Sequence, residues 1–188
     1  MAEHIEICRR LWSEDHATFE GKYHAFADVT IQPQPIQQPC PIWIAANPQP
    51  HEAEKPLRRV VQLADGWMSV NAFPGLFSSN WEKLSRYLKE ADKDPATYPT
   101  IAYHNINIHP DRSAALEESK RFLDEYYGPV FSPSMIEGWT AAGTPQQCVE
   151  ALLQLQREGA KAITLRITSW DQKGQFDRLV NEVLPKLT

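Results

Sequence analysis

Two short apolar segments, separated by a segment of helix length, constrain the fold of this chain more than any other feature. The first, residues 41–48, reads Pro-Ile-Trp-Ile-Ala-Ala-Asn-Pro, and the second, residues 64–68, reads Ala-Asp-Gly-Trp-Met. The first segment has strand length and is flanked by prolines, so we predict a short buried strand there. Residues 52–63 carry apolar side chains at helical spacing. A strand, helix, strand unit of this kind is typical of a parallel sheet with right-handed crossovers.

The spacing of apolar residues also predicts the strands and helices of the rest of the chain. We expect two more parallel strands, over 100–108 and 162–167, which makes about four in all. A small antiparallel excursion is expected near residues 18–31, then an extended proline-rich stretch over 32–39. Further helices are expected over 3–12, 77–91, 113–126, 145–157 and 176–187, with irregular chain over 128–143. Asp111 or Ser113 is expected to cap the helix over 113–126, and Thr144 with Gln147 forms a capping box for the next.

Composition narrows the class of protein. A chain of 188 residues supports one core, so we expect a single domain over 1–188. The net charge of -5, without basic clusters, argues against nucleic acid or a membrane surface as a partner and leaves small-molecule ligands. No apolar run is long enough to cross a bilayer, and no signal peptide is recognisable. Three scattered cysteines favour a reducing compartment, so we expect a cytoplasmic protein.

The order of several motifs along the chain is more specific than any one of them. They are Leu11-Trp12, Phe19-x-Gly21-x-Tyr23, the segments 41–46 and 64–67, Gly143-Thr144-Pro145-Gln146-Gln147, and Ala160-x-x-Ile163-Thr164-Leu165-Arg166. In this order the motifs resemble those of the bacterial luciferase-like flavin-dependent oxidoreductases. The resemblance covers nearly the whole chain, but only the C-terminal half of the family's barrel.

What the resemblance implies is an α/β fold, specifically part of a TIM-type (β/α) barrel with about four parallel strands and flanking helices. It also implies flavin mononucleotide (FMN) or the deazaflavin coenzyme F-420 at the C-terminal mouth of the strands. The first half of such a barrel is not represented in the sequence. Four parallel strands leave two open edges, at 42–46 and 162–167, so we expect a homodimer or association with an N-terminal half-barrel.

The loop Ala45-Ala46-Asn47-Pro48-Gln49 is the first candidate site. Small alanine side chains let a planar ring or a phosphate approach the backbone, and the following helix N-terminus favours an anion. Prolines at 48, 50 and 56 lack N–H donors, which argues against a tight phosphate cradle. The resemblance implies a role in binding the cofactor phosphate for residues 45–49, so we favour cofactor binding there over the alternative of an ordinary surface loop.

The strand over 100–108 is unusually polar for a buried parallel strand. Its odd-numbered positions, among them Tyr103, Asn105 and Asn107, lie on one face, whereas His104 shares the other face with isoleucines. We therefore interpret His104 as a packed core histidine and the odd-numbered face as the lining of a pocket. Asn107 and His109, near the end of the strand, are expected to bind substrate.

Arg166 near the end of the last strand is the third candidate site. A buried arginine must pair with an acid or face a polar cavity, so we expect Arg166 either to bind an anionic ligand or to form a salt bridge with Asp65 or Glu182. Asp65 itself is interpreted as ending a helix and holding a turn. The sequence contains no metal-ligand spacing and no nucleophilic triad, and it identifies no catalytic residue.

Two functions follow for the chain. The first is the C-terminal part of a luciferase-like flavin-dependent oxidoreductase or monooxygenase, contributing to its cofactor and substrate pocket. Any redox chemistry there would belong to the cofactor. The second is a non-catalytic truncated α/β fragment that associates with itself or with a partner chain. The sequence does not choose between FMN and deazaflavin, and it names no substrate.

Overall fold

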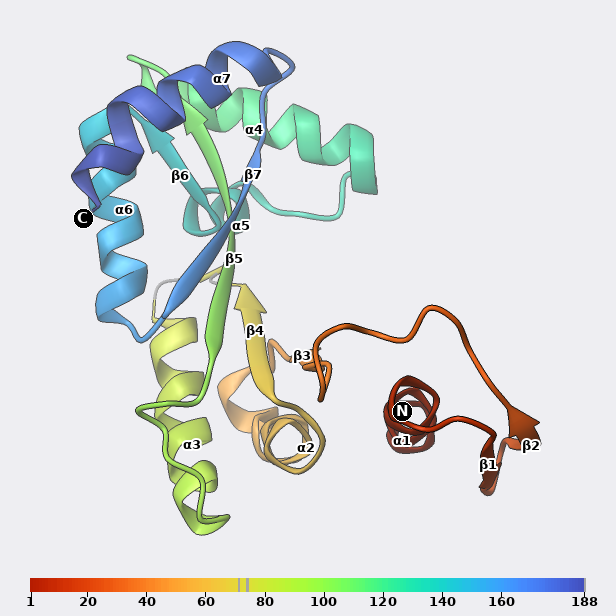
Figure 1. Ribbon diagram of the computed structural model, residues 1–188. Coiled ribbons are helices and arrows are strands. Elements are labelled where there is room, and N and C mark those ends of the chain that lie inside the picture. The colour runs from red at the N-terminus through yellow and green to blue at the C-terminus, as the bar shows by residue number, and fades with distance from the viewer. Residues whose placement is uncertain (71, 74, 188) are drawn as a thin grey trace.

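A parallel sheet flanked by helices forms the body of the computed structural model, which describes residues 1–70, 72–73 and 75–187 (Figure 1). The sheet is built from β3 (Trp43–Ala45), β4 (Gly66–Val70), β5 (Thr100–Ile108), β6 (Thr140–Gly143) and β7 (Ala162–Ile167). The helices are α1 (Ala2–Ser13), α2 (Glu54–Leu63), α3 (Leu76–Glu90), α4 (Arg112–Tyr127), α5 (Pro133–Gly138), α6 (Pro145–Arg157) and α7 (Gln172–Arg178). This architecture confirms the predicted α/β class.

The long strand β5 organises the sheet. It pairs with β7 along one edge, and its other edge pairs first with β4 at residues 100–103 and then with β6 at residues 105–108. The four predicted strands thus form the order β3, β4, β5, β7, all parallel. β6 extends the sheet beside the C-terminal half of β5.

Irregular chain was predicted over 128–143; residues 128–132 are irregular, but the prediction was wrong over 133–143. Ser132 caps the short helix α5 through a hydrogen bond from the Met135 amide, and β6 follows with all four residues buried. The sequence of β6, Thr-Ala-Ala-Gly, has little intrinsic strand propensity. Its conformation comes from backbone pairing with β5, including a 3.0 Å bond from the Asn105 amide to the Trp139 carbonyl.

Two helices, α4 and α6, begin at the caps predicted for them. Asp111 caps α4 by accepting hydrogen bonds from the amides of Ser113 and Ala114, and Thr144 with Gln147 forms the predicted capping box of α6. The helix predicted over 52–63 begins later, because a 3-10 turn at Pro50–Glu52 precedes α2. The closing helix begins earlier than predicted: α7 starts at Gln172 and continues into the wider turn Leu179–Val183 and the 3-10 turn Leu184–Lys186.

The N-terminal unit, residues 1–31, lies beside the sheet (Figure 1). It consists of α1 and the predicted antiparallel pair β1 (Ala17–Glu20) and β2 (Ala25–Val29). Arg9 joins it to the sheet, because its guanidinium contacts the Asp65 carboxylate at 2.8 Å. The same Asp65 oxygen accepts a 2.8 Å hydrogen bond from the Ile42 amide. Asp65 thus fixes the segment before β3 and anchors α1, whereas α2 ends at Leu63 with Ala64 as its C-cap, so the predicted role of Asp65 in ending that helix was wrong.

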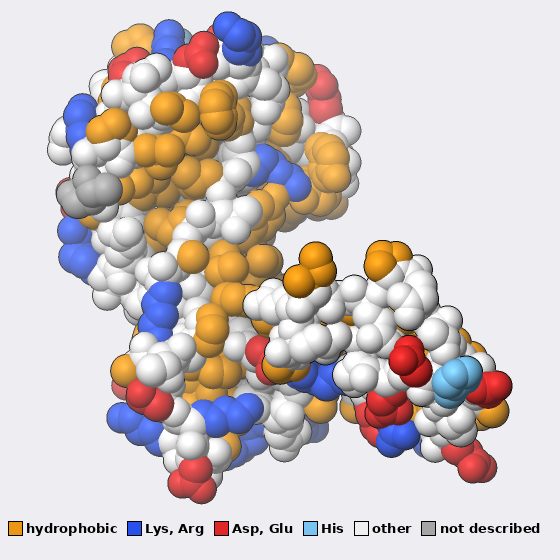
Figure 2. All heavy atoms as spheres, viewed as in Figure 1, with side chains coloured by type: hydrophobic (Ala, Val, Ile, Leu, Met, Phe, Trp, Pro, Cys, Tyr) orange, Lys and Arg blue, Asp and Glu red, His pale blue; other side chains and the backbone are white. Residues whose placement is uncertain are grey.

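The two faces of the sheet differ in how they are covered. Even-numbered residues of β5, such as Ile106, pack with α2, α3 and α6 in the main core. The other face, which we call the open face, carries Ala45, Met68, Val70, Tyr103, Asn105 and Arg166, as the strand registers show. α4 and α5 cover the open face only near the C-terminal half of β5. Figure 2 shows hydrophobic side chains gathered over the sheet near β5 and β7.

Candidate functional site

The loop after β3 is fixed in place by its neighbours. The indole Nε1 of Trp67 donates to the Ala46 carbonyl at 2.9 Å, and Asn80 Nδ2 donates to the Pro48 carbonyl at 3.0 Å. Asn47 Oδ1 accepts a 2.7 Å hydrogen bond from the Val70 amide. The side chain of Ala45 remains exposed at the end of β3. The loop therefore offers a small side chain on a rigid backbone, a surface that a planar ring can approach closely.

Phosphate binding fits this loop less well than ring binding. The Ala46 amide is already bonded to the Met68 carbonyl at 3.0 Å, and the Val70 amide is bonded to Asn47. Prolines at 48 and 50 have no amide hydrogen. Few backbone donors are thus left to surround a phosphate group, so the geometry of residues 45–49 suits a planar ring better than the phosphate expected from the resemblance.

Asn107 lies at the centre of a buried polar network at the C-terminal end of β5. Its Nδ2 donates to Glu118 Oε2 at 2.9 Å and to the Thr168 carbonyl at 3.0 Å. The hydroxyl of Ser169 donates to the other oxygen of Glu118 at 2.7 Å. Burial acts to raise the pKa of Glu118, but the hydrogen bonds from Asn107, Ser169 and the Trp170 amide outweigh it and lower the pKa. The network therefore holds a carboxylate in its charged form and joins α4 to the end of β7.

His104 and His109 occupy different environments, as the alternation along β5 predicts. His104 is only 3% exposed and faces the main core, where burial lowers its pKa to about 4. His109 is partly exposed just after β5, with Nδ1 2.8 Å from the Asp111 carbonyl oxygen. The interpretation of His104 as a packed core histidine is confirmed, and His109 is the histidine that lies at the C-terminal end of the sheet.

Arg166 is surrounded by aromatic rings. Its guanidinium carbon lies 5.3 Å from the ring centre of Tyr103, 5.0 Å from Tyr126 and 5.2 Å from Tyr127. One guanidinium nitrogen donates to the Tyr127 hydroxyl at 2.9 Å. The expected alternative of a salt bridge to Asp65 or Glu182 was wrong, since Asp65 pairs with Arg9 and no ion pair to Arg166 occurs within the described residues.

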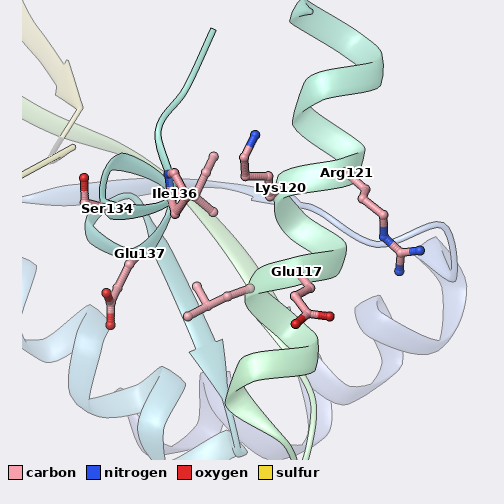
Figure 3. A pocket seen from close by; sticks show the side chains of 8 residues that line it. Glu117, Lys120, Arg121, Ser134, Ile136 and Glu137 are labelled. Atoms are coloured by element: carbon pink, nitrogen blue, oxygen red, sulfur yellow. The ribbon is translucent and has the colours of Figure 1, made fainter. Parts of the chain in front are cut away.

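Two pockets border α4. One, of about 450 Å³, is lined by Tyr103, Phe122, Tyr126, Leu165, Arg166, Ile167 and Gln172. The other, of about 620 Å³, lies between α4 and α5, and Figure 3 shows Lys120 on the side of α4 that faces Ile136, whereas Arg121 projects from the opposite side of the helix. Neither pocket includes residues 45–49. The structure therefore brings Arg166 to a pocket, but it does not bring Arg166 and the 45–49 loop into a single cavity.

Sequence reasoning missed several residues of this region. Glu118, Tyr126 and Tyr127 were not singled out, and Tyr126 is 68% exposed. The available signal was Arg166 itself, because a strand arginine without an acid requires other partners. Two consecutive tyrosines at the end of the predicted helix were candidates for that role.

Neither a metal centre nor a membrane-spanning helix is found in the described part of the chain. No group of three or more His, Cys, Asp or Glu side chains is arranged there to hold a metal ion. None of the helices in that part is long and apolar enough to cross a bilayer.

A family profile and individual relatives both relate this chain to flavin- and F420-dependent enzymes. The sequence profile of luciferase-like monooxygenases matches residues 1–162. An F420-dependent glucose-6-phosphate dehydrogenase of Amycolatopsis mediterranei is 39% identical over an alignment that covers 100% of this chain and 60% of that protein. The oxygenase component of a flavin-dependent trigonelline monooxygenase of Acinetobacter baylyi is 25% identical, with 98% and 59% covered.

Solved structures share the fold. An F420-dependent secondary alcohol dehydrogenase, solved with an F420-acetone adduct, superposes with a TM-score of 0.82 at 18% identity and covers 100% of this chain. The oxygenating constituent of a 3,6-diketocamphane monooxygenase of Pseudomonas putida, solved with FMN, has a TM-score of 0.69 at 15% identity and covers 99% of this chain. Only 61% and 62% of those chains are covered, and the chain likewise spans about 60% of the length of the curated relatives.

Proposed function

This chain belongs to the luciferase-like monooxygenase family, and from that membership we propose that it forms part of the cofactor and substrate pocket of an oxidoreductase. The cofactor class is flavin or deazaflavin, because relatives named for F420 and for flavin both align with the chain. The observation that carries the proposal is that Ala45 and Arg166 project from one face of one parallel sheet. Ligands of parallel α/β sheets bind at the C-terminal ends of the strands.

Residues 45–49 would contact the cofactor ring in this proposal. Ala45 is level with Ile101 in the strand register, whereas Arg166 is level with Asn105. Arg166 therefore lies four residues, or about 13 Å, further along the strand direction. This offset suits a cofactor ring at residues 45–49 and a substrate held beside Arg166, further toward the C-terminal ends of the strands.

Asn107, His109 and Arg166 would form the substrate side. Arg166 offers a positive charge, and His109 lies just after β5. Asn107 is fully buried, so it would act by holding Glu118 and the end of β7 in place. When bound, the flavin or deazaflavin supplies the hydride or electron transfer chemistry. The role of this chain is to position both molecules and to exclude water.

We also infer that further parallel strands pair with the two open edges of the sheet. β3 pairs only with β4, and β7 pairs only with β5, within the part of the chain that the structure describes. Unpaired edges of parallel strands are rarely left exposed to water. The strands that close them come either from a second copy of this chain or from another polypeptide segment that carries the N-terminal half of the barrel. A cytoplasmic location fits the three free cysteines.

Size-exclusion chromatography with light scattering, monitored at flavin absorbance, tests this proposal. A defined dimer that co-elutes with FMN or F420 would support the proposed oxidoreductase function, and it would indicate that a second copy of the chain pairs with the open edges of the sheet. A chain that binds neither cofactor, alone or with an added N-terminal half-barrel from a relative, would contradict it. That second result would favour the other candidate, a non-catalytic fragment, for which the unpaired edges of β3 and β7 are the supporting observation.

A further inference from the structure

Arg166 holds its positive charge among neutral aromatic groups. The guanidinium is half-buried, and its hydrogen bond to Tyr127 uses one of five N–H donors. The rings of Tyr103, Tyr126 and Tyr127 contribute favourable cation–π contacts at 5.0 to 5.3 Å. These contacts hold the guanidinium in one position but leave its charge without an anion.

Two acids of α4, the helix that carries Tyr126 and Tyr127, are already engaged. Asp124, on the same helix as the tyrosines, pairs with Lys120 at 2.6 Å. Glu118 accepts hydrogen bonds from Asn107 and Ser169. None of the residues that line the 450 Å³ pocket beside Arg166 is Asp or Glu. The pocket thus has one cation, one amide from Gln172, and otherwise aromatic and aliphatic walls.

We propose that this pocket binds an aromatic acid, with the anionic group on Arg166 and the ring against Tyr103, Phe122 and Tyr126. A guanidinium presents paired donors that match a carboxylate, sulfonate or phosphate, and aromatic side chains provide faces for a planar ligand. The volume lies within the range usual for small-molecule sites. The inference deepens the proposed function, on which it rests, by naming the substrate class of the Arg166 side.

The larger pocket between α4 and α5 lacks this combination. Lys120 is paired with Asp124, and the guanidinium of Arg121 stacks on Trp170 at 5.8 Å, pointing away from α5 (Figure 3). Glu137 pairs with Arg112 at 2.8 Å, and Glu117 adds a second carboxylate, so charges of both signs line that groove. Arg166 is the better-placed cation for an anionic ligand.

The test uses naphthalene-2-carboxylate and its neutral isostere naphthalene-2-carboxamide as probes on the full chain. Binding of each probe is measured by isothermal titration calorimetry at low salt. We expect the carboxylate to bind at least about 10-fold more tightly than the carboxamide, because only the carboxylate satisfies the guanidinium. This comparison needs no variant, so it decides the proposal even if a substitution unfolds the chain.

Variants then locate the site. Arg166→Gln should weaken carboxylate binding by about 10-fold or more while changing carboxamide binding by less than about 2-fold, and Arg166→Lys should lose an intermediate amount. The matched control is Arg86→Gln, because Arg86 also lies over a tyrosine ring, that of Tyr87 at 5.1 Å, but outside this pocket. Tyr126→Leu should weaken both probes, since both present the same ring.

Equal affinity for the two probes would overturn the proposal, as would an equal loss of carboxylate binding in Arg166→Gln and Arg86→Gln. A parallel titration with FMN or F420 separates this inference from the proposed function. Cofactor binding without carboxylate discrimination would overturn the substrate class alone. Discrimination without cofactor binding would support the anion pocket and contradict the cofactor part of the proposed function.

Discussion

Asn107 of β5 and Glu118 of α4 are joined by a 2.9 Å hydrogen bond from the amide nitrogen to a carboxylate oxygen. The two residues are 11 positions apart, and the bond ties the end of the central strand to the helix that covers it. The carboxylate also accepts from Ser169, so it joins β5, α4 and the loop after β7. This junction holds the C-terminal side of the candidate site.

Glu118→Ala should destabilise the chain, since it removes one of the two acceptors of the Asn107 amide and the acceptor of the Ser169 hydroxyl. We expect a loss of about 2 kcal/mol, given that hydrogen bonds to charged groups contribute more than neutral ones. Urea unfolding at pH 7 measures it. The exposed Glu117→Ala, one residue away, is the matched control and should change stability little. Equal losses in both variants would contradict the role assigned to Glu118.

The pH dependence of Glu118 follows from its lowered pKa. A carboxyl whose folded pKa lies below its ordinary value contributes stability above that ordinary value of 4.5 and loses it as pH falls through the folded pKa. Glu118→Gln should therefore cost more at pH 7 than at pH 3. A stability difference between wild type and Glu118→Gln that stays constant over this range would show that ionisation of Glu118 is irrelevant to the fold.

The lowered pKa of His104 predicts a separate loss of folding stability at acid pH. Its pKa is about 4 in the fold against an ordinary value of 6.5, so the unfolded chain binds more protons between these values. Stability should fall as pH drops from 6.5 toward 4, by up to about 3 kcal/mol. His104→Leu should abolish this part of the pH dependence. NMR titration of the His104 ring gives its pKa directly, and a value near 6.5 would refute the prediction.

Asp65 should control how firmly the N-terminal unit is held. Asp65→Ala removes the contacts to Arg9 and to the Ile42 amide. Because both charged side chains are partly exposed, we expect a modest loss of about 1 kcal/mol in global stability. Proteolysis within residues 30–42 should nevertheless accelerate. Asp28→Ala, which breaks the exposed pair with His16 in the same unit, is the control and should leave the cleavage rate unchanged.

Trp67 links the core to the candidate cofactor loop. Trp67→Phe keeps an aromatic ring next to Phe77, at 4.7 Å in the wild type, but removes the donor to the Ala46 carbonyl. We expect a loss of about 2 kcal/mol in stability and weaker cofactor binding, because the loop is less firmly fixed. Trp81→Phe on α3 serves as the control. If Trp67→Phe bound cofactor as well as wild type does, the 45–49 loop would not depend on this bond.

Much of the fold could be predicted because local patterns and tertiary packing agree. The strands over 100–108 and 162–167 have the predicted bounds, and the capping box at Thr144 starts α6. β6 could not be predicted, since its small residues become a strand only by pairing with β5. The start of α7 was placed too late because Asp171, which accepts from the Gly174 amide, was not recognised as a cap.

The candidate site was predictable only in part. Alternation along β5 separated His104 from Asn105 and Asn107 correctly, because neighbouring strand positions face opposite sides. The partners of Arg166 were beyond sequence reasoning, since Tyr127 is 39 positions away and reaches it only when α4 folds over the open face. The side-chain amide of Asn107 donates hydrogen bonds to Glu118 and to the Thr168 carbonyl. The alternation of a strand shows that Asn107 faces away from His104, but it does not reveal these partners.

Cofactor binding at Ala45 is the central claim, and fluorescence titration of the chain with FMN and with F420 tests it most directly. Ala45 is exposed, so Ala45→Leu should leave stability nearly unchanged while its larger side chain blocks the ring. The near-isosteric Ala45→Ser is the matched control. The account predicts saturable binding of one cofactor by wild type and Ala45→Ser, with binding weakened by about 10-fold or more in Ala45→Leu. Equal binding by all three proteins would contradict it.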